Sequence, residues 1–162
     1  MYFKFLNFKL KNRVTAEIRG GPLAPKISGR VIVRRMKGGS EVIAEVYNLP
    51  PYRRNDDRAE PIGPHGFHIH EFGDCTIGDP ENPFMAAGGH WNPDNEPHGN
   101  HAGDLPNLFS NNGYSFMRVY SNKFLPMDVR NRSVIIHENP DDFRTQPSGN
   151  SGKRLACGIL LR

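Results

Sequence analysis

The 162-residue sequence lacks any run of about 18 consecutive apolar residues, which excludes a transmembrane helix. Apolar residues make up only 36% of the chain, yet ten Phe and five Tyr argue against a disordered chain. Cysteine is also scarce, and the two residues allow either one disulfide or two free thiols. Glycine and proline are abundant, with 17 and 14 residues, so the chain is rich in loops and a bundle of long helices is excluded. Its length fits one domain with a core of its own.

The net charge of +4 is small, and the basic residues are scattered. No platform of aromatic and basic residues is evident, so we expect no nucleic-acid partner. The excess fits either a small anionic substrate or an ordinary basic surface. The first twelve residues do not form a signal peptide, because Lys4, Lys9 and Lys11 interrupt the apolar residues. We therefore expect a cytoplasmic protein, with export as the alternative if the start is trimmed.

Alternation of apolar and polar residues, bounded by turn residues, predicts β-strands along most of the chain. The predicted strands cover residues 14–19, 27–35, 41–47, 66–71, 114–119, 133–137 and 155–161. The segment 36–40 is typical of a hairpin turn. Two long loops are expected. One follows residue 71 and extends to 113, where five prolines exclude regular structure, and the other covers 138–153. Close strands joined by turns predict an antiparallel sandwich or barrel.

Three histidines lie on predicted strands. His68 and His70 are two residues apart, so their side chains project from the same face and could bind one metal ion. A hydrogen-bonded pair on a half-exposed strand is the alternative. His137 ends the apolar strand 133–137, where it is either a third ligand or a core histidine with its hydrogen bonds satisfied.

The first long loop carries a second group of candidate ligands. His98, His101 and Asp104 lie within seven residues, and imidazole together with a carboxylate suits zinc. A polar loop with incidental histidines is the alternative. His90 could complete either group, or both at once, because an imidazole ring has two nitrogens.

Five segments in this order resemble the copper/zinc superoxide dismutases. They are Gly66–Cys75 (GFHIHEFGDC), Gly89–Pro93 (GHWNP), His101–Leu105 (HAGDL), Ile136–Asp142 (IHENPDD) and Ser148–Gly158 (SGNSGKRLACG). The resemblance implies an all-β fold, a Greek-key antiparallel sandwich or flattened barrel of about eight strands with two long loops. It places this domain at residues 13–162, after an N-terminal extension or edge strand at 1–12.

The resemblance also implies roles for individual residues. Copper would be held by His68, His70, His90 and His137, and zinc by His90, His98, His101 and Asp104. His90 would bridge the two metals and take part in catalysis. Arg154 would attract and orient the substrate, superoxide. Asp141 would connect a copper ligand with a zinc ligand, Cys75 and Cys157 would form a disulfide, and His65 would be structural.

The implied function is dismutation of superoxide to oxygen and hydrogen peroxide, with a non-catalytic copper or zinc carrier on the same fold as the alternative. The resemblance does not decide the oligomeric state, which is either a monomer or a homodimer. The spacing from His98 to His101 is shorter than in the animal enzymes, and the loop 138–153 lacks their run of charged residues. Steering of the anion is therefore expected to depend more on Lys153, Arg154 and the metals.

Overall fold

A computed structural model describes residues 12–53 and 63–162, so the expectation for residues 1–12 lies, apart from Asn12, outside the described residues. The described chain forms eight β-strands and one 3-10 helix, η1 (Met85–Ala87). The strands are β1 (Arg13–Gly20), β2 (Ser28–Met36), β3 (Gly39–Tyr47), β4 (His65–His70), β5 (Asp104–Leu108), β6 (Ser115–Ser121), β7 (Ser133–His137) and β8 (Arg154–Ile159). Among the described residues, no helix has the length and apolar character needed to cross a bilayer.

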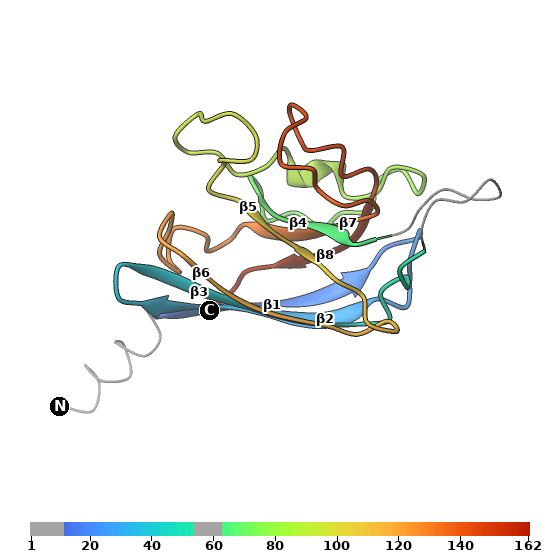
Figure 1. Ribbon diagram of the computed structural model, residues 1–162, viewed down its shortest axis with the longest axis horizontal. Coiled ribbons are helices and arrows are strands. Elements are labelled where there is room, and N and C mark those ends of the chain that lie inside the picture. Colours follow the sequence, from blue (N-terminus) through green and yellow to red (C-terminus); the bar gives the residue numbers. More distant parts are fainter. Residues whose placement is uncertain (1–11, 54–62) are drawn as a thin grey trace.

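The strands form one antiparallel sheet in the order β5-β4-β7-β8-β1-β2-β3-β6. The sheet curls into a nearly closed barrel, with β4, β5, β7 and β8 on one side and β1, β2, β3 and β6 on the other (Figure 1). The pairs β1-β2, β2-β3, β4-β5 and β7-β8 are neighbours in both sequence and space, and the pairs β4-β7, β8-β1 and β3-β6 require crossovers. This confirms the predicted Greek-key all-β fold.

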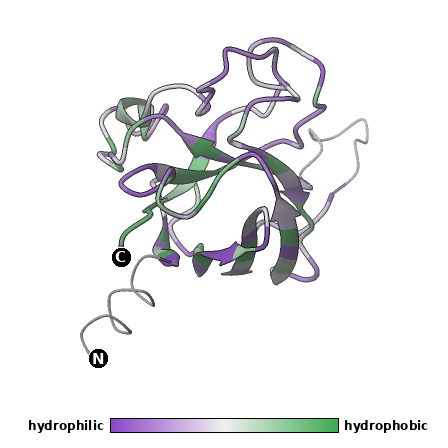
Figure 2. Cartoon of the chain, turned by 90° about the vertical axis from the view of Figure 1, so that its left-hand side faces the viewer, coloured by the Kyte–Doolittle hydropathy of each residue, from purple (hydrophilic) through white to green (hydrophobic). Residues whose placement is uncertain are grey.

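Apolar side chains at alternate positions of the strands fill the interior of the barrel. Val14, Ala16 and Ile18 of β1 point inward and are buried, and Val31 and Val33 of β2 continue the same core. The hydropathy colouring in Figure 2 shows the apolar and polar segments alternating along these strands. The predicted hairpin is also present, since β2 ends at Met36 and β3 begins at Gly39 with Met36 paired to Gly39.

One prediction is wrong: the first long loop contains a strand, β5, that was expected to be irregular. Pro106 lies in the middle of β5 and is exposed. β5 pairs on one side with β4 and lies at an end of the strand order, and proline is tolerated on such an edge strand because no partner needs its missing N–H. The predicted loop 138–153 contains no strand. Both loops lie over the β4–β7 side of the barrel (Figure 1).

Candidate metal centre

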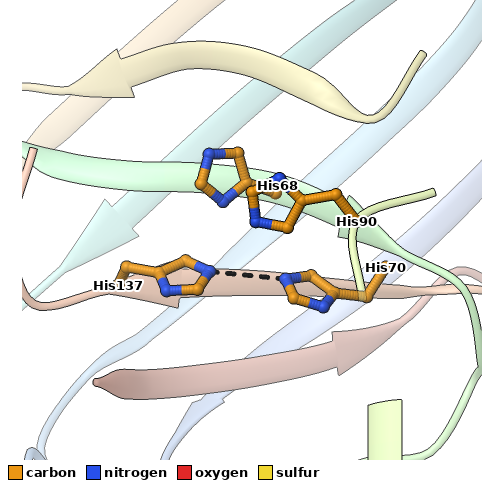
Figure 3. A group of neighbouring side chains, drawn as sticks. All are labelled: His68, His70, His90 and His137. Carbon is orange, nitrogen blue, oxygen red and sulfur yellow. Dashed lines mark hydrogen bonds between the residues drawn. The ribbon is translucent and has the colours of Figure 1, made fainter. Parts of the chain in front are cut away.

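The barrel brings four histidines together beside β4 and β7. β4 carries His68 and His70, β7 ends at His137, and His90 of the first long loop pairs with His70 through an isolated β-bridge. Each ring offers one nitrogen to a group in which all four atoms lie within 4.8 Å of one another. Figure 3 shows the His70 and His137 rings facing each other, with the rings of His68 and His90 beside this pair. His68 and His70 thus lie on one strand and in one group, as the sequence predicted, and His137 joins them from the neighbouring strand β7.

A second group adjoins the first and shares His90 with it. It consists of His90, His98, His101 and Asp104, whose candidate ligand atoms also lie within 4.8 Å of one another. Asp104 begins β5 and pairs with His68, so the sheet register places the two groups next to each other. The Nδ1 atom of His90 lies 2.9 Å from Oδ1 of Asp104.

Hydrogen bonds orient the rings of the first group. Nδ1 of His70 donates to the carbonyl oxygen of Gly88 at 3.1 Å, and Nδ1 of His137 donates to that of Gly152 at 3.4 Å. Both Nε2 atoms then carry lone pairs in the neutral rings, and they lie 3.3 Å apart. Two lone pairs facing each other repel unless a cation lies between them. This pair is therefore arranged for a metal ion.

Four buried ring nitrogens lack any hydrogen-bond partner in the described part of the chain. They are Nδ1 of His68, Nε2 of His90, Nδ1 of His98 and Nδ1 of His101. The last two lie 3.2 and 3.3 Å from the Asp104 carboxylate but do not hydrogen-bond to it. A buried polar atom without a partner is costly and rare. Four of them in two adjoining groups fit metal ligation, and imidazole nitrogens with one carboxylate suit copper and zinc.

Asp141 connects the two groups. Its Oδ2 accepts a hydrogen bond from Nε2 of His68, and its Oδ1 accepts one from Nε2 of His98, both at 2.8 Å. Because Nε2 of each ring is held in this way, Nδ1 is the nitrogen that remains for a metal. Asp141 is itself fixed by Asn107, whose side-chain amide accepts from its backbone N–H at 2.8 Å and donates to its carbonyl at 2.9 Å. Sequence analysis assigned no role to Asn107, because its contact joins β5 to a loop residue 34 positions further along the chain.

Burial keeps the histidines neutral. Desolvation lowers the pKa of His68 to about 4, and it lowers the pKa of His70 and of His137 well below the usual value. Neutral imidazole is the form that binds metals. Burial alone would raise the pKa of Asp104, but its hydrogen bond with His90 and its nearby histidines outweigh this and lower it. Asp104 is therefore ionised, as a metal ligand requires.

An open cleft of about 690 Å³ leads to these groups. It is lined by His70, His90, His101 and His137, together with Lys153 and Arg154. Two carbonyl oxygens fix the guanidinium of Arg154, that of Phe84 at 2.6 Å from Nη1 and that of Gly88 at 2.7 Å from Nη2. Burial lowers the pKa of Arg154, but an arginine remains charged in proteins. The cleft therefore presents a fixed cation beside the first histidine group.

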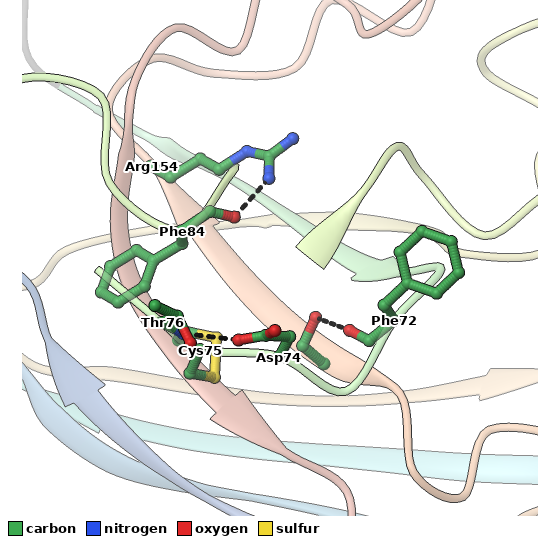
Figure 4. The surroundings of a disulfide bond; sticks show 8 residues. Phe72, Asp74, Cys75, Thr76, Phe84 and Arg154 are labelled. Carbon is green, nitrogen blue, oxygen red and sulfur yellow. Dashed lines mark hydrogen bonds between the residues drawn. A yellow bond between two sulfur atoms is a disulfide. The ribbon is translucent and has the colours of Figure 1, made fainter. Parts of the chain in front are cut away.

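The predicted disulfide is present between Cys75 and Cys157, which are 82 positions apart (Figure 4). Cys157 lies in β8, three residues after Arg154, so the bond ties the loop after β4 to the strand that carries this arginine. His65 lies outside both groups. Its ring nitrogens are 2.9 and 3.1 Å from the carbonyl oxygens of His137 and Pro50, which is a structural arrangement.

Comparison with known proteins places the chain in a family. The family model described as copper/zinc superoxide dismutase (SODC) matches residues 27–160. The Cu-Zn superoxide dismutase of Legionella pneumophila is 32% identical over 164 residues, which cover 96% of this chain and 91% of that protein. The human copper chaperone for superoxide dismutase is 39% identical over 119 residues, 65% of this chain and 41% of that protein. The structure of the Cu/Zn superoxide dismutase from Brucella abortus aligns with a TM-score of 0.74 at 28% identity, over 91% of this chain and 99% of that one.

The fold and the two adjoining histidine groups define a β-barrel protein built around a two-metal site. The chain belongs to the copper/zinc superoxide dismutase family, a family of oxidoreductases that use copper and zinc.

Proposed function

We propose that this protein catalyses the dismutation of superoxide to oxygen and hydrogen peroxide. The observation that carries the proposal is the first histidine group, whose four rings converge in a cleft that also holds Arg154. A protein that only stored metal would need the ligands but no fixed cation beside them. The small anionic substrate provides a reason for that cation.

We assign copper to His68, His70, His90 and His137, and zinc to His90, His98, His101 and Asp104. When bound, copper supplies the one-electron redox chemistry that dismutation requires, while zinc, which has no redox chemistry, fixes its ligands. The assignment rests on the donor sets: four imidazoles suit copper, and three imidazoles with a carboxylate suit zinc. His90 belongs to both groups, with Nδ1 beside Asp104 and Nε2 free of any hydrogen bond within the described chain.

The protein's own groups have two tasks in the reaction, which are to hold a proton and to bind the anion. Two superoxide anions and two protons give one oxygen and one hydrogen peroxide, so protons must reach the cleft. Nε2 of His90 is the atom we assign to hold one proton between the two half-reactions, and water in the open cleft delivers the other. Arg154 binds and orients the anion with N–H donors that the carbonyls of Phe84 and Gly88 leave available.

Lys153 extends this positive region toward the surface. It lines the same cleft, and its ammonium lies 3.9 Å from Oε2 of Glu81, a loose and exposed ion pair that screens little of its charge. We propose that Lys153 and Arg154 together steer the substrate in place of a charged loop.

A metal carrier without turnover is the second candidate, favoured by the likeness to a copper chaperone. Stopped-flow measurement of superoxide decay separates the two candidates. The full chain, reconstituted with one copper and one zinc, is compared with the same sample after chelation. We expect decay far faster than in buffer, at a rate that falls as salt increases and is lost on chelation. Decay no faster than in buffer, with both metals bound, would establish the carrier instead.

The disulfide indicates the cellular compartment in which the protein functions. Disulfides persist in oxidising compartments and are rare in the cytosol. The Cys75–Cys157 bond therefore supports export, the alternative to the cytoplasmic location expected from the first residues.

A further inference from the structure

The turn that carries three of the four residues of the second ligand group is short and polar. His98, His101 and Asp104 fall within seven residues, and Gly99 and Asn100 between them are exposed. The carboxylate of Asp104 closes the turn by accepting from the backbone N–H groups of Gly99 and His101 at 2.9 and 3.0 Å. Side chains from two other loops also contact this turn and contribute to its order.

Lys123 contacts this turn from the loop that follows β6. Its ammonium has three donors, and the turn supplies three acceptors. They are the carbonyl and side-chain oxygens of Asn100, at 3.0 and 2.8 Å, and the carbonyl of His101 at 3.3 Å. The next residue, Phe124, is buried and its carbonyl accepts from Ser40 of β3 at 2.9 Å. Lys123 therefore connects the turn to a fixed point on the barrel.

Gln146 contacts the other end of the turn from the loop 138–153. Its Oε1 accepts from the backbone N–H of His98 at 2.8 Å, and its Nε2 donates to the carbonyl of His98 at 3.2 Å. One amide group thus holds both backbone polar groups of a single ligand residue. Neither Gln146 nor Lys123 belongs to either ligand group.

We propose that Lys123 and Gln146 are positioning residues that set the zinc affinity of this protein by holding the backbone of the His98–Asp104 turn in its ligating conformation. Both act on the turn, mainly through its backbone groups, rather than on the metal. Together they fix His98, Asn100 and His101 from two different loops. The inference rests on the zinc assignment proposed above and not on dismutation.

Electrostatics makes a prediction of the opposite sign, which allows a clear test. A positive ammonium close to a zinc site repels Zn²⁺, so removing its charge would strengthen zinc binding if charge were the main effect. If position is the main effect, removing the ammonium weakens zinc binding, and Lys123→Arg, which keeps both charge and donors, restores most of it.

The experiment measures the zinc dissociation constant of the full chain by competition with a chromophoric zinc chelator. The variants are Lys123→Met, Lys123→Arg and Gln146→Met. Lys26→Met is the control, since Lys26 is exposed and its side chain has no hydrogen-bond or ion-pair partner within residues 12–53 and 63–162. Copper dissociation constants and thermal unfolding of the metal-free protein are measured on the same samples, which identifies any general loss of structure.

We expect zinc binding about tenfold weaker in Lys123→Met and in Gln146→Met, which is the lower end of the effect of outer-sphere partners on metal affinity. Copper binding and the unfolding temperature should stay near those of Lys26→Met. Zinc binding that is unchanged or stronger in Lys123→Met, or equally weaker zinc and copper binding, would overturn the inference. A parent protein that fails to bind zinc would overturn the ligand assignment itself, and activity would not affect either result.

Discussion

Replacing Asp141 with asparagine tests the connection between the two ligand groups. Both carboxylate oxygens accept hydrogen bonds of 2.8 Å from imidazole N–H groups, one of His68 and one of His98, and all three side chains are fully buried. Asparagine has one acceptor oxygen, and its amide nitrogen would face the second N–H donor to donor. One of the two histidines therefore loses its acceptor.

The size of the effect follows from burial. A buried donor left without a partner costs about 1–3 kcal/mol. Since about 1.4 kcal/mol is a factor of ten, the dissociation constant of at least one metal should rise by roughly 5- to 150-fold. The cost falls on metal binding because the released ring no longer keeps its Nδ1 directed at the site.

Chelator competition for copper and for zinc, carried out on the full chain, measures this change. Asp142→Asn is the matched control, because that neighbouring carboxylate is exposed and, in the part of the chain that the structure describes, bonds only to Arg144 and Thr145 of its own loop. Affinities for both metals within twofold of the parent in Asp141→Asn would refute the reasoning. So would an equal loss in the control.

Four further predictions concern other parts of the molecule. His137→Ala should abolish superoxide dismutation yet leave zinc bound, by metal analysis, and loss of zinc would mean that the groups are assigned wrongly. Arg154→Ala should lower the rate of superoxide decay and its dependence on salt with metal content unchanged, and an unchanged rate would mean that another group guides the anion. Cys75→Ser should lower the free energy of unfolding by up to about 4.5 kcal/mol, the chain-entropy value for a separation of 82, and a urea titration showing no loss would contradict it. Hydrogen bonds from Arg118 and Arg34 lower the pKa of Glu41, so the stabilising effect of the ionised carboxylate is present above about pH 4.5 and is lost as the pH falls. The free energy of unfolding of the metal-free Glu41→Gln variant, from urea titrations, should differ from that of the parent near neutral pH and converge with it in acid. A difference that stays constant with pH would contradict this.

The strands could largely be predicted from the sequence because apolar and polar residues alternate along a strand with one face in the core and one in solvent. β7 (Ser133–His137) has the predicted bounds, and β1 to β3 differ from prediction by at most two residues. β5 could not be predicted in this way. Pro106 and Asn107 interrupt its pattern, and only its place at the edge of the sheet makes proline acceptable there.

The candidate site divides in the same manner. His68 and His70 follow from strand geometry, but the approach of His137 and His90 depends on sheet register and on a loop that no local pattern specifies. The resemblance to a family supplied those positions. It could not supply Lys123 or Gln146, because their partners are mostly backbone groups, in residues 22 and 48 positions away, and such contacts leave no periodic signal.

The central claim is that one chain holds copper and zinc in two adjoining sites that share His90. Anomalous diffraction at the copper and zinc absorption edges, from crystals of the reconstituted protein, tests it most directly. We predict a copper peak among His68, His70, His90 and His137, and a separate zinc peak beside Asp104, with the His90 ring between them. A single peak, exchanged metals, or a His90 ring that contacts neither metal would contradict the account.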